Sequence, residues 1–88
     1  MGLFIMQISD LSLNELTTVI LREFSSERRS GSDIVKLFNY LGFSDDYWEL
    51  NKKGEFGSRR DFTNKKLAEI NGTFKLISLI EILVDDRQ

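Results

Sequence analysis

The segment from Phe74 to Val84 constrains the fold of this chain more than any other feature. Eight of its eleven residues are apolar, and the polar ones (Lys75, Ser78 and Glu81) are spaced by three, so a helix here has only one narrow polar stripe. Asn71-Gly72-Thr73 just before it is typical of one helix ending and another being capped. We therefore predict a helix over 74–84, although its isoleucines and valine would also suit a strand.

A helix with so little polar surface lies either in the centre of a bundle or in a protein–protein contact. The sequence does not decide between these two placements. In a chain of 88 residues, three short neighbouring helices can hardly cover it completely. We therefore expect an exposed part of this helix to form an interface, with four candidate residues: Leu76, Leu79, Ile80 and Leu83.

Capping signals and helical periodicity predict the remaining helices. Ser12 with Glu15 forms a capping box for a helix that runs to about Phe24. Ser30 or Ser32 opens a second helix over 33–41, which ends at Gly42. A single helical turn is expected within 44–50, and another helix begins between 58 and 63 and ends at 71–72.

Together these elements predict an all-α fold, a compact bundle of four to five short helices with one long loop or small hairpin around residues 51–58. We expect residues 1–10 to form a tail or short edge segment and residues 11–84 to form a single helical domain. Residues 85–88 are interpreted as the start of a linker to a downstream domain. The apolar start of the chain is too short to span a membrane and lacks the flanks of a signal peptide, so we expect a cytoplasmic protein without a membrane partner.

The composition restricts the chemistry. The chain has no cysteine and no histidine, which removes disulfides, thiolate metal sites and histidine acid–base catalysis. Its one dense carboxylate cluster outside the C-terminus is Asp45, Asp46 and Glu49, which lacks the spacing of a calcium loop. We expect Asp45 and Asp46 to cap the helical turn that follows them. No enzyme activity, cofactor or small-molecule substrate is therefore predicted.

The charge is unevenly distributed. Between residues 28 and 66 there are nine basic and six acidic residues, whereas the rest of the chain has three basic and eight acidic ones. Phe56 and Phe62 alternate with the basic residues, a pattern found in single-strand and RNA binders. The alternative is a solvated helix face with both rings in the core, and the burial of the two rings separates these readings. The candidate anion or nucleic-acid contacts are Lys52, Lys53, Arg59, Arg60, Lys65 and Lys66.

Two stretches, RSGSDIVKLFNYLGFSD (residues 29–45) and GSRRDFTNKKLAEINGT (57–73), resemble the N-terminal region of bacterial abortive-infection-type (phage-defence) proteins. The resemblance implies an N-terminal accessory domain of a phage-defence or related stress protein, with its effector activity further downstream. It implies no catalytic residues here. The matching positions of interest are the loop 57–60 and the turns at Gly31 and at Gly42-Phe43. Residues 51–55 are an insertion relative to the family pattern.

The leading hypothesis is a non-enzymatic N-terminal recognition or regulatory domain that works through protein–protein contacts or self-association. The alternative is a nucleic-acid-binding helical module that uses the basic loop and helix start at residues 52–66. It predicts salt-sensitive binding that is weakened almost uniformly across nucleic-acid sequences when these charges are reversed.

Overall fold

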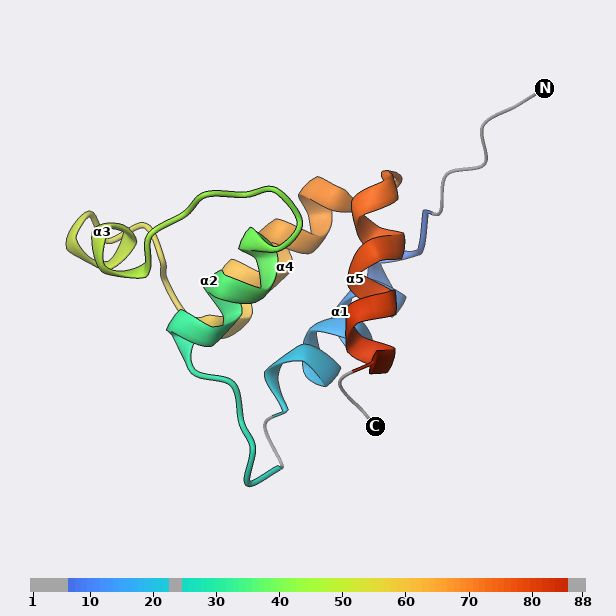
Figure 1. Cartoon of the computed structure of the whole chain (residues 1–88), viewed down its shortest axis with the longest axis horizontal. Coiled ribbons are helices and arrows are strands. Elements are labelled where there is room, and N and C mark those ends of the chain that lie inside the picture. Colours follow the sequence, from blue (N-terminus) through green and yellow to red (C-terminus); the bar gives the residue numbers. More distant parts are fainter. Residues whose placement is uncertain (1–6, 23–24, 86–88) are drawn as a thin grey trace.

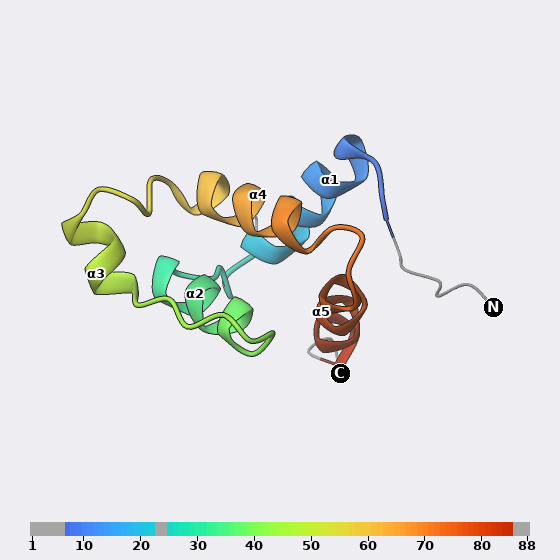
Figure 2. The ribbon, with the colours of Figure 1, turned by 90° about the horizontal axis from the view of Figure 1, so that it is seen from above.

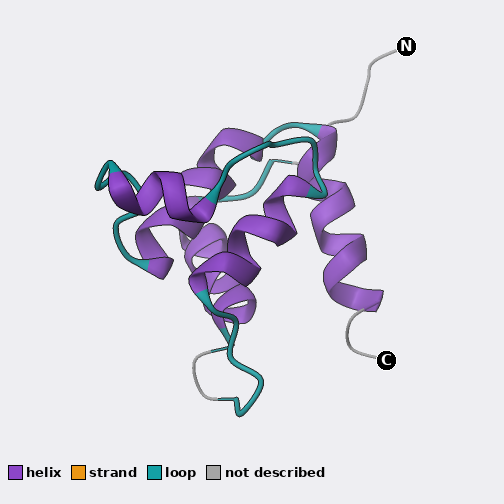
Figure 3. Cartoon of the chain, turned by 60° about the vertical axis from the view of Figure 1, so that its left-hand side comes forward, coloured by secondary structure: helices purple, strands orange, loops and turns teal. Residues whose placement is uncertain are grey.

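Five helices account for the regular structure in the computed structural model, which describes residues 7–22 and 25–85. No strand occurs in these residues, so the segment 53–58 is a turn and loop and not a hairpin (Figure 3). The predicted all-α bundle is confirmed. The helices are α1 (Asp10–Leu21), α2 (Gly31–Asn39), α3 (Tyr47–Lys52), α4 (Arg59–Ile70) and α5 (Phe74–Asp85).

The helix α4 organises the molecule. It packs against both α1 and α2, and its carboxyl end lies next to α5 (Figure 2). The short helix α3 contacts α2 and lies at the opposite end of the molecule from α5 (Figure 1). None of the described helices is both long enough and apolar enough to cross a lipid bilayer.

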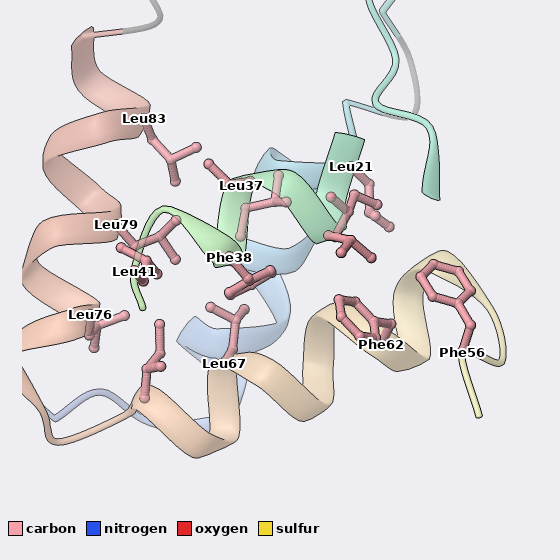
Figure 4. Close-up of a cluster of buried hydrophobic side chains, with 14 residues drawn as sticks. Leu21, Leu37, Phe38, Leu41, Phe56, Phe62, Leu67, Leu76, Leu79 and Leu83 are labelled. Carbon is pink, nitrogen blue, oxygen red and sulfur yellow. The ribbon is translucent and has the colours of Figure 1, made fainter. Parts of the chain in front are cut away.

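The core is formed mainly by leucine, isoleucine and phenylalanine side chains from α1, α2, α4 and α5 (Figure 4). Leu76, Leu79 and Leu83 on α5 extend toward α2 and α4, and all three are buried. This face of α5 therefore lies in the domain's own core, the first of the two placements that the sequence allowed. The fully or nearly fully buried apolar residues are Ile20, Leu21, Ile34, Val35, Leu37, Phe38, Leu41, Phe56, Phe62, Leu67, Ile70, Leu76, Leu79 and Leu83.

Most predicted caps are in place. Ser30 and not Ser32 caps α2, and it forms a reciprocal capping box with Asp33. Ser58 caps α4. The predicted cap of α1 was wrong: Ser9 is the N-cap, and the backbone N–H of Ser12 donates to its hydroxyl.

Helix α1 ends at Leu21, three residues before the predicted end at Phe24, which lies outside the described residues. Arg22 follows in the left-handed region with φ of 51°, and this conformation ends the helix. At the other end of α1, the segment that precedes the helix is hydrogen-bonded to the turn between α4 and α5. The side chain of Asn71 donates to Ile8 O and accepts from Ile8 N, both at 2.9 Å. The predicted N-terminal tail is therefore anchored from Ile8 onward.

Candidate functional site

Arg59 and Arg60 use their guanidinium groups to join α4 to other parts of the fold. Arg59 Nη1 donates to Arg29 O at 3.0 Å and to Leu21 O at 3.5 Å. Arg60 donates to Asn14 Oδ1 and Thr18 Oγ1 on α1, both at 3.3 Å. Two of the six predicted nucleic-acid contacts therefore also hold the first turn of α4 against α1 and the loop before α2.

Lys66, a third predicted contact, is buried. Its ammonium lies 2.7 Å from Asp45 Oδ2, 3.6 Å from Glu69 Oε2 and 4.0 Å from the centre of the Phe43 ring. These interactions fasten the loop between α2 and α3 onto α4. The Lys66 ammonium is therefore directed into the protein and not toward a solvent-borne phosphate.

The other three predicted contacts, Lys52, Lys53 and Lys65, are exposed. Lys52 forms a surface ion pair with Glu49 at 3.9 Å, a type that contributes little to stability. The six basic residues thus divide into three with structural partners and three on the surface. They do not form one solvent-facing patch.

The cluster of carboxylates has structural roles. Asp46 caps α3 by accepting from Glu49 N at 3.0 Å, as the sequence predicted for this turn. Asp45 is the ion-pair partner of Lys66, and the carboxylate of Glu49 pairs with Lys52. In the described part of the chain, no group of three or more acidic side chains is arranged to hold a metal ion.

A continuous series of aromatic rings runs from the core to the surface. Phe38 contacts Phe62 edge-on at 6.2 Å, and Phe62 stacks on Phe56 at 4.9 Å. Tyr47 lies edge-on to Phe56 at 5.0 Å, and Trp48 contacts Tyr47 at 5.4 Å. Phe56 and Phe62 are only 5% and 4% exposed, so these two rings belong to the core and offer no face to a nucleic-acid base (Figure 4).

Trp48 ends the series at the surface with 72% of its area exposed. Tyr47 and Leu50, three residues apart on α3, are partly buried against the core, which turns Trp48 outward. Tyr47 in turn lies directly over Gly31, the first residue of α2. A methyl group at Gly31 would place its carbon 2.5 Å from Tyr47 Cε1.

Gly31 is therefore required for close packing of α3 and not, as predicted, for a turn. Its φ lies outside the left-handed region, in contrast to Gly42 with φ of 104°. The sequence predicted a helical turn within 44–50, but it did not show which of the two large aromatics on that turn, Tyr47 or Trp48, is exposed. The spacing of Tyr47 and Leu50 is the signal that could have indicated it.

Comparisons with known proteins found no match. This holds for protein-family models, for curated proteins and for solved structures. The resemblance to abortive-infection-type proteins therefore rests on the sequence pattern alone, and the surface around Trp48 is the structural starting point for a function.

Proposed function

We propose that this chain is a non-enzymatic recognition domain of a bacterial defence or stress protein, and that it works by contact with another protein or with a second copy of itself. The observation that carries the proposal is the exposed and firmly supported indole of Trp48. Tryptophan is among the residues most enriched at the energetic centres of protein interfaces. The bacterial defence context is supported by the sequence pattern of residues 29–45 and 57–73.

The support beneath Trp48 suits it to recognition. Its neighbour Tyr47 is fixed between Gly31 and Phe56, so α3 has little freedom to rearrange on binding. A side chain that is already ordered loses less conformational entropy in a complex. Lys52, one turn further along α3, shares the face of Trp48 and supplies a charged border to the apolar centre.

Nucleic-acid binding is the less well supported alternative. Arg59, Arg60 and Lys66 have structural partners, and both predicted stacking rings are buried. What remains for this alternative is the set of exposed lysines on α3 and α4.

Fluorescence anisotropy with labelled duplex DNA, single-stranded DNA and RNA tests that alternative. The variant should be Lys52→Glu/Lys53→Glu, because reversing Arg59 or Arg60 would also disturb the packing of α1. Salt-sensitive binding that disappears in this variant would make the chain a nucleic-acid binder. No binding at low salt would leave the protein-contact function.

The protein-contact function is tested directly through Trp48, the only tryptophan of the chain. We expect the emission of a solvated indole in dilute protein and a shift to shorter wavelength when a partner covers the ring. Sedimentation equilibrium over the same concentration series shows whether the partner is a second copy. For a different partner, a photo-cross-linking residue at exposed Glu49 captures it, with exposed Glu15 on α1 as the matched control position.

The captured protein is then purified and its affinity is measured by calorimetry. We expect Trp48→Ala to weaken binding at least about tenfold, which corresponds to about 1.4 kcal/mol. The proposed site would be contradicted if the Trp48→Ala variant bound the partner as tightly as the unchanged chain. It would also be contradicted if a cross-linker at position 15 captured the same proteins as one at position 49.

A further inference from the structure

A basic hollow of about 570 Å³ opens between the end of α1, the loop before α2 and the side of α2, and it reaches α5. In Figure 1 the loop before α2 lies at the bottom of the view, below α1 and α2. Among the described residues, four cationic side chains line it, together with the two acids Glu27 and Asp33. The four cations are Arg22, Arg28, Arg29 and Lys36.

The two acids of the hollow already have partners. Glu27 Oε2 lies 3.6 Å from Arg22 Nη1. Asp33 accepts from Ser30 N at 3.2 Å, and hydrogen bonds from the side chain and backbone of Ser30 lower the pKa of its carboxyl group. Both acids are therefore held by groups of the chain itself.

The cations differ in how far they are engaged. Arg29 Nη1 donates to Ile20 O at 2.9 Å, which fixes it in the wall of the hollow. Arg28 and Lys36 are exposed, and no carboxylate of the described residues lies within ion-pair distance of either. Positive charge is thus available to a ligand at Arg28 and Lys36.

The hollow also has an apolar side. Leu37 on α2 and Ile82 on α5 line it, and the ring of Tyr40 stands at its border with 82% of its area exposed. Lys36 and Tyr40 also line a second hollow of about 310 Å³, so both residues are accessible from two sides. An apolar side chain would find a place beside Tyr40, with positive charge nearby.

We propose that this hollow binds an acidic segment of a partner protein, with carboxylates at Arg28 and Lys36 and an apolar side chain against Tyr40 and Ile82. The cations come from three parts of the chain, and the acids Glu27 and Asp33 line the same hollow. A wall that carries both signs of charge suits separate carboxylates on a peptide better than a uniformly charged nucleic-acid backbone. The contact goes beyond the proposed function, because it uses a surface separate from Trp48.

The test is a titration of the ¹⁵N-labelled chain with a short synthetic peptide in which leucines are flanked by glutamates and aspartates, followed by NMR. We expect shifts of the backbone amides of residues 27–40 and of Ile82, with those of α3 unchanged. Arg28→Glu/Lys36→Glu should weaken binding at least about tenfold. Lys52→Glu/Lys53→Glu, which changes the net charge equally at exposed positions at the end of α3 and just after it, should change it less than about twofold.

Inorganic phosphate and a single-stranded DNA oligonucleotide of similar charge form the comparison arms. Weaker binding of both than of the peptide supports the proposal, whereas phosphate or oligonucleotide binding as strongly as the peptide would overturn it. Equal loss in both double variants, or absence of peptide binding, would also overturn it. Should circular dichroism show that Arg28→Glu/Lys36→Glu is unfolded, Tyr40→Ala replaces it, and unchanged affinity in that variant counts against the site. Trp48→Ala should leave peptide binding intact, which separates this test from that of the proposed function.

Discussion

Lys66 is a basic residue whose charge is paired inside the protein and is not available at its surface. Its side chain is only 9% exposed, and its ammonium lies 2.7 Å from Asp45 Oδ2. Removing a charge from water costs free energy, so the buried ammonium of Lys66 depends on the largely buried carboxylate of Asp45. Truncating one of them leaves the other uncompensated, whereas replacing both by apolar residues does not.

We predict that Asp45→Ala lowers the free energy of unfolding by about 2–4 kcal/mol, near the lower end for buried pairs because Asp45 is partly exposed. The double variant Asp45→Leu/Lys66→Met should lose less than the sum of its single changes. Urea denaturation measures each value. The exposed pair Glu49 and Lys52 is the control, for which a double-mutant cycle should give less than about 0.5 kcal/mol. Additive losses at Asp45 and Lys66 would mean that the two charges do not depend on each other.

Packing of α3 on α2 is the contact between elements on which the position of Trp48 depends. Gly31 leaves room for the ring of Tyr47, and this ring is in edge-to-face contact with the indole of Trp48. The Tyr47 ring cannot move without changing its contacts with both Phe56 and Trp48.

Gly31→Ala should therefore displace Tyr47 and change the environment of Trp48. We expect a destabilisation of about 1–3 kcal/mol, typical of overpacking, together with altered near-ultraviolet circular dichroism of the aromatic residues. Gly54→Ala is a useful comparison, since nothing lies within 4 Å of a methyl group there, although its φ of 69° adds some backbone strain. Unchanged aromatic dichroism in Gly31→Ala would show that Tyr47 adapts without moving Trp48.

The capping box of α2 gives a pH-dependent contribution to stability. Hydrogen bonds from Ser30, first from its side chain and then from its backbone, lower the pKa of Asp33 below its ordinary value. Since the folded state holds the carboxylate, this stability is present above about pH 4 and is lost as the pH falls below that through the lowered pKa.

We predict that Asp33→Asn flattens the dependence of stability on pH in this acidic range. Thermal unfolding at a series of pH values checks this. Ser30→Ala should lower the free energy of unfolding by about 1 kcal/mol at neutral pH, as is usual for loss of an N-cap. An equally steep acid dependence in Asp33→Asn would assign that dependence to other carboxylates.

At the scale of the whole molecule, α5 has a buried face and an exposed one. Leu76, Leu79 and Leu83 are in the core, whereas Phe74 and Val84 are 53% and 55% exposed. Three of the four interface candidates suggested by the sequence are therefore buried in the core, and the fourth, Ile80, is half-buried. The well-exposed apolar residues of the helix were not among those candidates.

We predict that Leu83→Asp unfolds the domain or lowers the free energy of unfolding by more than about 3 kcal/mol, because it places a charge in the core. Val84→Asp should change it by no more than about 0.5 kcal/mol. Circular dichroism with urea denaturation measures both, and sedimentation shows any change of mass. A Leu83→Asp variant whose free energy of unfolding is as little changed as that of Val84→Asp would contradict the buried position of this face.

Local signals predicted much of the fold. Ser30 and Ser58 act on neighbouring backbone groups, so the helix starts that they mark can be read from the sequence. The predicted end of the second helix at residue 41 was less accurate, because α2 ends at Asn39 and Gly42, with its positive φ, follows a further turn. Partners distant in the chain could not be read in this way. The contacts of Arg59 with Arg29 and of Lys66 with Asp45 exist only once α4 has packed, so the basic residues looked like one available group.

The clasp between Asn71 and Ile8 gives the domain a defined mechanical point of attachment. Both hydrogen bonds join the chain before α1 to the corner between α4 and α5. A pull on the chain ahead of Ile8 is therefore carried first by this corner, and only after the clasp opens by α1 and its contacts with α4.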